Sequence, residues 1–280
     1  PHPAAGKNIR THWTQCMTKT DPTPYLFTAE GLAQLHAFID SKTLFAFDLD
    51  GTLAPIVAEP CNIQIPEAIL AQLIILNKWA NMAVITGRSR HDALFHLGFV
   101  PKYLVGNHGA EGLPGLEAQE ENFIRLAQTW EDQLHAMLPD ADQLGLFIEN
   151  KRATLSIHYR NCMGDDTIHS RLMDVIEKLM PQPRRIGGKC IENLIPANAP
   201  DKGFAMKHLM RHAGYIKGFF VGDDKTDEDV FELPGDNIFT VRVGNESETR
   251  ARYVLQSQME IPRLLQEINF LEPKDYHSNR

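Results

Sequence analysis

The sequence has few cysteines, no apolar run as long as a membrane-spanning helix, and no excess of positive charge. Its four cysteines are widely separated and form no metal-like pairs, so we expect reduced thiols in a reducing compartment. The absence of a long apolar run and of a secretory leader predicts a cytoplasmic protein with no membrane partner. The net charge of −8 argues against a nucleic-acid partner. We expect a monomer.

The composition is that of an ordinary globular protein. The 280 residues are 43% hydrophobic and 23% charged, which suits one large domain or two modest ones. An acidic enzyme that acts on an anionic substrate needs local cations, so individual lysines and arginines near any acidic site gain importance.

Short apolar strands alternate with helices in two separate parts of the chain, residues 25–112 and 199–280. The expected strands are 44–47, 82–86, 103–107, 218–222, 238–243 and 253–256, and the expected helices are 28–40, 66–80, 89–97, 202–213 and 260–270. Strands that alternate with helices favour right-handed parallel crossovers. We therefore predict an α/β core with a doubly wound, Rossmann-like parallel sheet, preceded by a loose N-terminal extension over residues 1–24.

Residues 113–198 differ in pattern and predict a smaller inserted α/β domain. Its expected elements are helices 122–138 and 166–180, strands 146–150 and 153–160, and short strands within 185–195. In the second strand the polar residues occupy alternate positions (Thr154, Ser156, His158 and Arg160). This alternation predicts an antiparallel sheet with one face in water.

The most informative motif is Asp-Leu-Asp-Gly-Thr-Leu, which follows the first core strand. Asp48 and Asp50 are two positions apart, so their side chains begin on the same side of the chain. Two carboxylates this close repel each other unless a cation lies between them or one of them keeps a proton. The motif therefore suggests a metal site, acid–base chemistry, or both.

Polar clusters follow the other core strands as well. Thr86-Gly87-Arg88 follows the second strand, Asn107-His108-Gly109 the third, and Asp223-Asp224 the fourth, with Asp227 just beyond. Ligands of open parallel sheets bind beyond the carboxyl ends of the strands. Several carboxylates at one sheet edge need a cation, and oxygen ligands with room for water and phosphate suit Mg²⁺. For any single aspartate, a solvated loop carboxylate is an even alternative.

These residues suit phosphoryl transfer. Asp48 is a candidate nucleophile, and Asp50 is a candidate acid that later activates water as a base. Thr86 lies at the start of a helix whose amides favour an anion, and Lys202 supplies a positive charge for phosphate. Taken alone, a threonine or a Lys-Gly pair is usually an ordinary cap or surface residue.

This combination resembles the haloacid dehalogenase-like phosphatase superfamily, whose four motifs match the Asp48–Asp50 segment, Thr86, Lys202 and the Asp223–Asp227 segment in order. The stretch 222–231, together with the Arg88 and Asn107-His108 clusters, is more narrowly similar to trehalose-6-phosphate phosphatases. The resemblance covers about residues 40–260. It implies that Asp48 is the nucleophile and Asp50 the acid–base residue. It also implies a metal held by Asp48, the Asp50 carbonyl and Asp223, with Asp224 nearby.

The same resemblance implies that residues 113–198 are a mobile cap that binds the sugar. The matching elements are Glu149 and Lys151, Arg160, and Lys189 after Gly188, all of which a hairpin with solvated charges also explains. Arg88, Asn107 and His108 join these candidates, although His108 suits orienting its loop better than proton transfer. Where the family usually has a glutamate, this sequence has Asn193, with Glu192 one residue early. Either Asn193 replaces the carboxylate or a bulge restores Glu192.

The leading hypothesis is a Mg²⁺-dependent phosphatase that converts trehalose 6-phosphate to trehalose and phosphate through an aspartyl-phosphate. A phosphatase for another sugar phosphate, such as sucrose phosphate or a glucosyl or mannosyl glycerate phosphate, is the alternative enzyme. A silent sugar-phosphate-sensing domain is the alternative from another class, and it predicts damaged motifs, whereas all four motifs are intact here.

Overall fold

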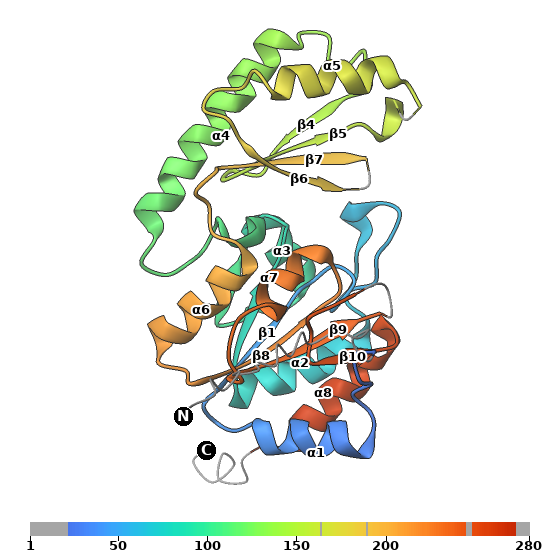
Figure 1. Ribbon diagram of the computed structural model, residues 1–280, viewed down its shortest axis with the longest axis vertical. Coiled ribbons are helices and arrows are strands. Elements are labelled where there is room, and N and C mark those ends of the chain that lie inside the picture. The colour runs from blue at the N-terminus through green and yellow to red at the C-terminus, as the bar shows by residue number, and fades with distance from the viewer. Residues whose placement is uncertain (1–21, 163, 189, 245–247, 273–280) are drawn as a thin grey trace, which may run out of the picture.

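A six-stranded parallel sheet lies at the centre of the larger part of the protein (Figure 1). The computed structural model describes residues 22–162, 164–188, 190–244 and 248–272. The sheet order is β10-β9-β8-β1-β2-β3, and its strands are β1 (Thr43–Phe47), β2 (Asn81–Ile85), β3 (Tyr103–Val105), β8 (Lys217–Gly222), β9 (Ile238–Val243) and β10 (Tyr253–Leu255). All neighbouring strands are parallel, which confirms the predicted α/β core.

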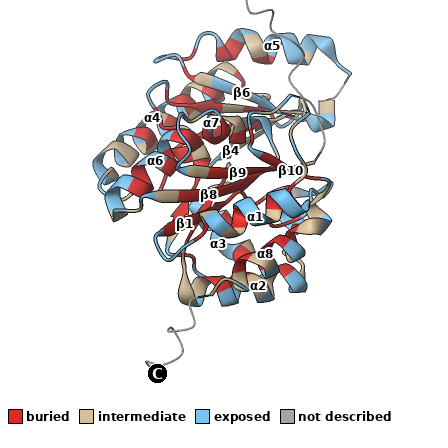
Figure 2. Ribbon diagram, turned by 60° about the horizontal axis from the view of Figure 1, so that its bottom comes forward, coloured by how far each residue is buried: buried red, intermediate tan, exposed pale blue. Residues whose placement is uncertain are grey.

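Helices cover both faces of this sheet, because successive side chains of a strand point to opposite sides. Phe45 and Phe47 of β1 pack with α1 (Ala29–Phe38), α2 (Glu67–Trp79), α3 (Arg90–Leu97) and α8 (Ile261–Asn269). Leu44 and Ala46 pack on the other side with α6 (Lys202–Ala213) and α7 (Glu228–Phe231). The central strands are accordingly buried, while the helices expose their outer faces (Figure 2).

An antiparallel four-stranded sheet lies between the larger sheet and two long helices (Figure 1). Its order is β4-β5-β7-β6, with β4 (Phe147–Asn150), β5 (Leu155–His158), β6 (Arg184–Gly188) and β7 (Ile191–Ile195). Helices α4 (Glu117–Met137) and α5 (Asp166–Ile176) pack on one face around Trp130, Ile157 and Leu194. The chain leaves the core and returns to it at almost one point, since a Cβ on Gly109 would lie 2.8 Å from the Asp201 carbonyl oxygen.

Two helix boundaries differ from the predictions. Helix α4 begins at Glu117 rather than residue 122, because its polar first turn lies outside the apolar stripe that marks the helix in the sequence. In that turn, the Glu120 carboxylate accepts a hydrogen bond from the Gly112 amide across 2.8 Å. Helix α5 ends at Ile176 rather than residue 180, and the chain then turns so that the Pro181 carbonyl accepts a hydrogen bond from the Trp130 indole.

The prediction of a water-exposed face on the second inserted strand is wrong. Thr154 and Ser156 are buried, because this polar face is turned toward the larger sheet. The Thr154 hydroxyl donates a hydrogen bond of 2.8 Å to the side-chain oxygen of Asn107, which follows β3. Strand β5 also ends at His158, so Arg160 lies in a 3-10 helix, η3 (Arg160–Cys162), instead of ending the strand.

The predicted N-terminal extension falls mostly on residues 1–21, outside the described residues. The chain that follows is joined to the sheet edge, since Leu26 donates a backbone hydrogen bond to Val254 of β10 and Pro24 accepts one from it. Within the described part of the chain, no helix has the length and apolar character needed to cross a membrane.

Candidate active site

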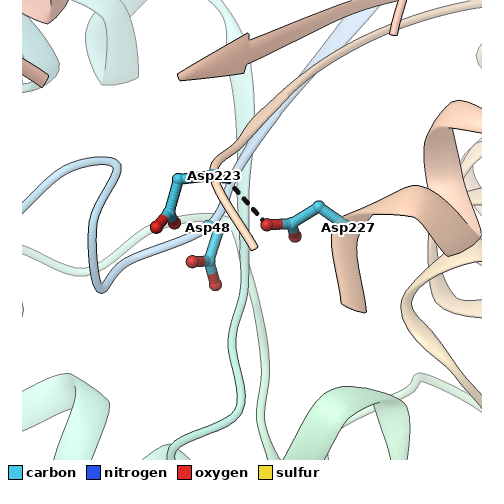
Figure 3. A group of neighbouring side chains, drawn as sticks. All are labelled: Asp48, Asp223 and Asp227. Atoms are coloured by element: carbon cyan, nitrogen blue, oxygen red, sulfur yellow. Dashed lines mark hydrogen bonds between the residues drawn. The ribbon is translucent and has the colours of Figure 1, made fainter. Parts of the chain in front are cut away.

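Three carboxylates meet at the carboxyl edge of the larger sheet (Figure 3). Asp48 directly follows β1, Asp223 follows the neighbouring strand β8, and Asp227 lies in the 3-10 helix η4 (Lys225–Asp227). One oxygen from each carboxylate lies within 4.8 Å of the others. The sequence placed these aspartates at one edge, and the parallel pairing of β1 with β8 brings them into contact range.

Gly51 allows this close approach. Its φ of 83° is in the left-handed region that glycine adopts without strain. A Cβ at this position would lie 2.0 Å from Asp223 Oδ2, so any side chain would displace that carboxylate. The glycine of the Asp-x-Asp-Gly-Thr motif is therefore required by the aspartate at the end of the next strand.

Lys202 lies between two of the carboxylates. It is in the first turn of α6, which Asp201 caps by accepting a hydrogen bond from the Phe204 amide. The Lys202 ammonium group is buried and donates hydrogen bonds to Asp48 Oδ1 at 2.8 Å and to Asp227 Oδ1 at 2.7 Å. The lysine predicted to bind phosphate thus also neutralises part of the acidic cluster.

The pKa values of this cluster follow from burial and mutual repulsion. Burial raises the pKa of Asp48 well above its usual range, and the charges of Asp227 and Asp223 raise it further. Burial and the charge of Asp227 raise the pKa of Asp223 to about 7. Burial alone would lower the pKa of Lys202, but the charges of Asp227 and Asp48 outweigh it and raise that pKa. The site has more negative charge than one lysine balances.

Asp227 is saturated with hydrogen bonds inside the protein. Its Oδ2 accepts bonds of 2.9 Å from the backbone amides of Asp223 and Asp224, and its Oδ1 accepts the bond from Lys202. Asp48 and Asp223 keep more coordination capacity, although Asp223 Oδ1 accepts a bond of 3.3 Å from the Thr52 hydroxyl. Two such carboxylates with space for water and phosphate oxygens fit Mg²⁺. Asp224, which was expected near the metal, is exposed and lies outside the cluster. Asp227 takes the position beside Asp48 and Asp223 instead.

The side chain of Asp50 is held apart from the three clustered carboxylates. The guanidinium group of Arg88 donates to both of its oxygens at 2.7 Å, and a third bond of 2.7 Å joins Arg88 to Asp92 of α3. Thr86 is fully buried between these groups and the sheet, and its hydroxyl accepts a bond of 3.2 Å from the Arg88 amide. Arg88, predicted to bind substrate, therefore also fixes the orientation of Asp50.

Asn107 joins the core to the inserted sheet. Its side-chain nitrogen donates to Glu111 at 3.0 Å and to the Lys151 carbonyl at 2.9 Å, and its oxygen accepts the bond from Thr154. The side chain is completely buried, with both donor hydrogens engaged. The structure thus gives the amide a role between the two sheets that the sequence pattern did not indicate.

The neighbouring His108 packs its ring against Gly87, where a Cβ would lie 2.5 Å from the ring. Burial lowers the pKa of His108 to about 3, and the positive charges of Lys202, Lys151 and Arg184 act in the same direction. The ring is therefore neutral at ordinary pH, which does not suit it to donate a proton in a reaction.

Glu149 and Lys151 lie on the face of the inserted sheet that is turned toward the core. Their charged groups are 3.9 Å apart, and His158 Nε2 lies 2.8 Å from Glu149 Oε2. Burial opposes a low pKa for Glu149, but the hydrogen bond from His158 and the charge of Lys151 outweigh it and lower the pKa. Burial lowers the pKa of Lys151. Sequence reasoning missed His158, although its position on the same strand face as Ser156 was visible.

The pairing of β5, β6 and β7 is regular at Asn193, with Asn193 opposite both Ser156 and Ile186. Asn193 therefore shares the core-facing side of the sheet with Ser156. Glu192 points to the opposite side, where it is buried and bonds to Arg185 at 3.2 Å. No bulge restores the glutamate, so Glu192 is not placed to contact a sugar at the core-facing side.

Two sugar-binding candidates of the inserted domain remain, Arg160 and Lys189, and the structure describes only the first. Arg160 donates a hydrogen bond of 2.7 Å to the Ala58 carbonyl, in the segment after the Asp48–Asp50 loop. Lys189 lies outside the described residues.

Comparisons with known proteins agree with the acidic site, since the similar proteins are phosphatases. The family model described as trehalose-phosphatase matches residues 46–259. A trehalose-6-phosphate phosphatase of Escherichia coli (strain K12) is 32% identical over 203 residues, which cover 70% of this chain and 74% of the bacterial protein. A probable trehalose-phosphate phosphatase G of Arabidopsis thaliana is 26% identical over 266 residues, 83% of this chain and 70% of the plant protein.

The fold of this chain is also similar to that of a solved structure. The C-terminal domain of a trehalose-6-phosphate phosphatase from C. albicans superposes with a TM-score of 0.67 at 20% identity, covering 89% of this chain and 99% of that domain.

Proposed function

Because this chain belongs to the trehalose-phosphatase family, it is a phosphoric monoester hydrolase of trehalose 6-phosphate, and we propose that Asp48 carries out the reaction as a nucleophile. The observation that supports this role is the cluster of the buried Asp48 and Lys202 with the half-buried Asp223 at the carboxyl edge of the sheet. Lys202 engages only Oδ1 of Asp48, which leaves Oδ2 to attack phosphorus.

The proposed reaction has two steps. In the first, Asp48 forms a bond to phosphorus while the bond from phosphorus to the sugar oxygen breaks, and Asp50 gives that oxygen a proton. In the second, Asp50 takes a proton from water, the water oxygen attacks phosphorus, and Asp48 is released with inorganic phosphate. In the structure Arg88 donates to both oxygens of Asp50, so the proposed proton transfer requires Asp50 to release at least one of these bonds when substrate binds.

Two further residues are proposed to bind the transferred phosphate. Lys202 uses two of its three N–H donors on Asp48 and Asp227, so one donor remains for a phosphate oxygen. Thr86 directly follows β2, at the same edge of the sheet as Asp48.

We propose Mg²⁺ as the metal of this site. The carboxylates of Asp48 and Asp223 and the backbone carbonyl of Asp50 would hold it, with Asp227 behind them as a positioning residue. A bound cation would neutralise the carboxylates and the phosphoryl oxygens, whose negative charges otherwise repel each other. The raised pKa values of Asp48 and Asp223 support the need for positive charge here.

We propose that residues 113–198 act as the cap over this site. Glu149, Lys151 and His158 are its candidate sugar contacts on the core-facing side. Asn193 shares that side, but its oxygen accepts a bond of 2.6 Å from Ser156 and its nitrogen donates to the Ile186 carbonyl. Asn193 is therefore a weaker sugar ligand than a free carboxylate.

We also propose that the enzyme works as a monomer in the cytoplasm. Among the described residues, Cys61 and Cys162 are free thiols, as a reducing compartment allows. Sedimentation at micromolar concentration tests the monomer, and a dimer mass would contradict it.

The test of the function is phosphate release from a panel of sugar phosphates with Mg²⁺ and with EDTA. We expect trehalose 6-phosphate to be preferred, and EDTA to abolish turnover. The variant Asp48→Asn should lose about a thousandfold or more of the activity. The exposed Asp224→Asn is the matched control and should stay close to wild type. Undiminished turnover in Asp48→Asn would contradict the mechanism, and a wide preference for another sugar phosphate would contradict the substrate.

A further inference from the structure

Phe147 is an exposed aromatic side chain on the core-facing side of the inserted sheet. It pairs with His158 across β4 and β5, and the next residue, Ile148, pairs with the buried Ile157 on the helix-covered side. Phe147 therefore shares its side with Glu149 and with Thr154, whose hydroxyl bonds to Asn107 of the core. Despite this inward direction, Phe147 is 58% exposed.

The ring of Phe147 is held beside the polar groups proposed to bind sugar. Its centroid lies 5.6 Å from that of His158, at an interplanar angle of 36°. His158 in turn lies 2.8 Å from Glu149. A single exposed aromatic residue is common on protein surfaces. A phenyl ring next to a carboxylate and an imidazole on the side that faces the catalytic edge is the combination that binds a sugar ring by its apolar face and its hydroxyls.

The two ends of β4 lie near different segments of the core. The Lys151 end is next to the phosphate region, because Asn107 donates to the Lys151 carbonyl and its own amide donates to the Arg88 carbonyl. The other end is at Phe147, which pairs with His158 of β5. Arg160, two residues after His158, donates a hydrogen bond to the Ala58 carbonyl of the core. Four residues of strand separate Phe147 from Lys151, about 13 Å at the usual rise. A single sugar ring is less than half that long and cannot reach both residues. Two linked rings are long enough to extend from Lys151 toward Phe147.

We propose that Phe147 contacts the second sugar ring of the substrate and makes the enzyme select disaccharide phosphates over monosaccharide phosphates. The inference rests on the proposed sugar-phosphatase function and adds a residue that decides specificity. The phosphate and the first ring bind between Lys202, Lys151 and Glu149. The C–H face of the second ring packs on the phenyl ring of Phe147.

The experiment compares Phe147→Ala and Phe147→Trp with the wild type on trehalose 6-phosphate and on glucose 6-phosphate. For Phe147→Ala we expect kcat/KM on trehalose 6-phosphate to fall about tenfold, mainly through KM, since one aromatic contact contributes about that factor. On glucose 6-phosphate the change should stay within about twofold. Phe147→Trp keeps an aromatic face and should restore most of the lost kcat/KM.

A binding measurement separates recognition from catalysis. Trehalose itself should inhibit the wild type competitively, and its inhibition constant should rise about tenfold in Phe147→Ala, whereas inhibition by glucose should not change. The matched control is Phe95→Ala, which removes an exposed ring from α3 of the core rather than from the inserted sheet, and should leave all these constants unchanged. Because Phe147 is exposed, its removal should also leave the thermal midpoint unchanged.

Equal losses on both substrates, or no loss on trehalose 6-phosphate, would overturn the role of Phe147. Failure of the wild type to release phosphate from either substrate would instead refute the proposed function, so the two failures are distinguishable.

Discussion

Lys202 and Asp48 lie 154 positions apart in the chain, yet the lysine ammonium donates a 2.8 Å hydrogen bond to the aspartate. Asp48 comes from the part of the core before the inserted sheet, and Lys202 from the part after it. The proposed nucleophile and the lysine that binds it therefore come together only when both parts of the core fold into one sheet.

Lys202→Met should abolish turnover and destabilise the protein. Removing the lysine leaves Asp48 and Asp227 buried without their cation, and such a loss costs about 3–5 kcal/mol. Chemical denaturation in EDTA measures this change. The double variant Lys202→Met/Asp227→Asn removes one of the two orphaned charges and should regain part of the stability without regaining activity. A fully stable and active Lys202→Met would refute the role given to this lysine.

Asp227→Asn should weaken Mg²⁺ binding although Asp227 is not a direct ligand in our proposal. Its carboxylate accepts the amides of Asp223 and Asp224 and so positions Asp223. Loss of a group that orients a ligand typically lowers metal affinity by about 10–100-fold. Calorimetric titration with Mg²⁺ measures this, and the exposed Asp224→Asn is the control, with a change of about twofold at most. The opposite ranking of the two variants would show that Asp224 is the supporting residue.

His108 should make the stability sensitive to acid. Its folded-state pKa is lowered to about 3 from an ordinary value of 6.5, so the unfolded chain binds a proton between these values and the folded protein does not. Stability from this group is thus fully present above pH 6.5 and falls by about 1.4 kcal/mol per pH unit toward pH 3. His108→Asn tolerates the left-handed backbone and does not titrate. Urea denaturation from pH 7 to 4.5 should show a shallower decline for this variant, and parallel curves would contradict the assignment.

Asn107→Ala should impair the use of sugar phosphates more than the chemistry itself. The substitution removes the bonds to the Lys151 carbonyl and Thr154 and leaves buried partners unsatisfied, which costs about 2–4 kcal/mol. Because Lys151 and Glu149 lose their fixed position, KM for trehalose 6-phosphate should rise about tenfold. Turnover of p-nitrophenyl phosphate, which has no sugar to bind, should change little. The exposed Asn150→Ala is the control, and equal losses on both substrates would show a general structural effect.

The sequence was sufficient for the parallel core because its signals are local. Apolar runs of four residues mark β1 and β2, and β8 and β9 are short segments rich in Phe, Val and Ile. The polar residues that follow these strands share the carboxyl edge of the sheet. Thr86 and Asp223 were placed at this edge by that rule alone. The meeting of acidic residues at this edge could thus be expected before any contact was known.

The remaining site features depend on contacts that no local pattern encodes. Nothing in the sequence distinguishes the carboxylate of Asp224 from that of Asp227. In the structure, the turn of η4 directs Asp227 into the protein and leaves Asp224 exposed. Thr154 and Ser156 alternate with apolar residues as a water-exposed face would, yet both are buried, with Thr154 bonded to Asn107 of the core and Ser156 to Asn193. For Asn193, regular pairing with Ser156 decided between two registers that the sequence left open.

The insert departs from the core and rejoins it where Gly109 meets the Asp201 carbonyl. With its two ends already adjacent, the inserted segment adds little loop-closure entropy to the folding of the core, whatever its length. Evolution and protein engineering are then free to lengthen, shorten or exchange the inserted sheet while β1, β8 and α6 keep their arrangement. If this sheet binds the sugar, as we propose, substrate selectivity and bond cleavage are encoded in separate segments of the chain.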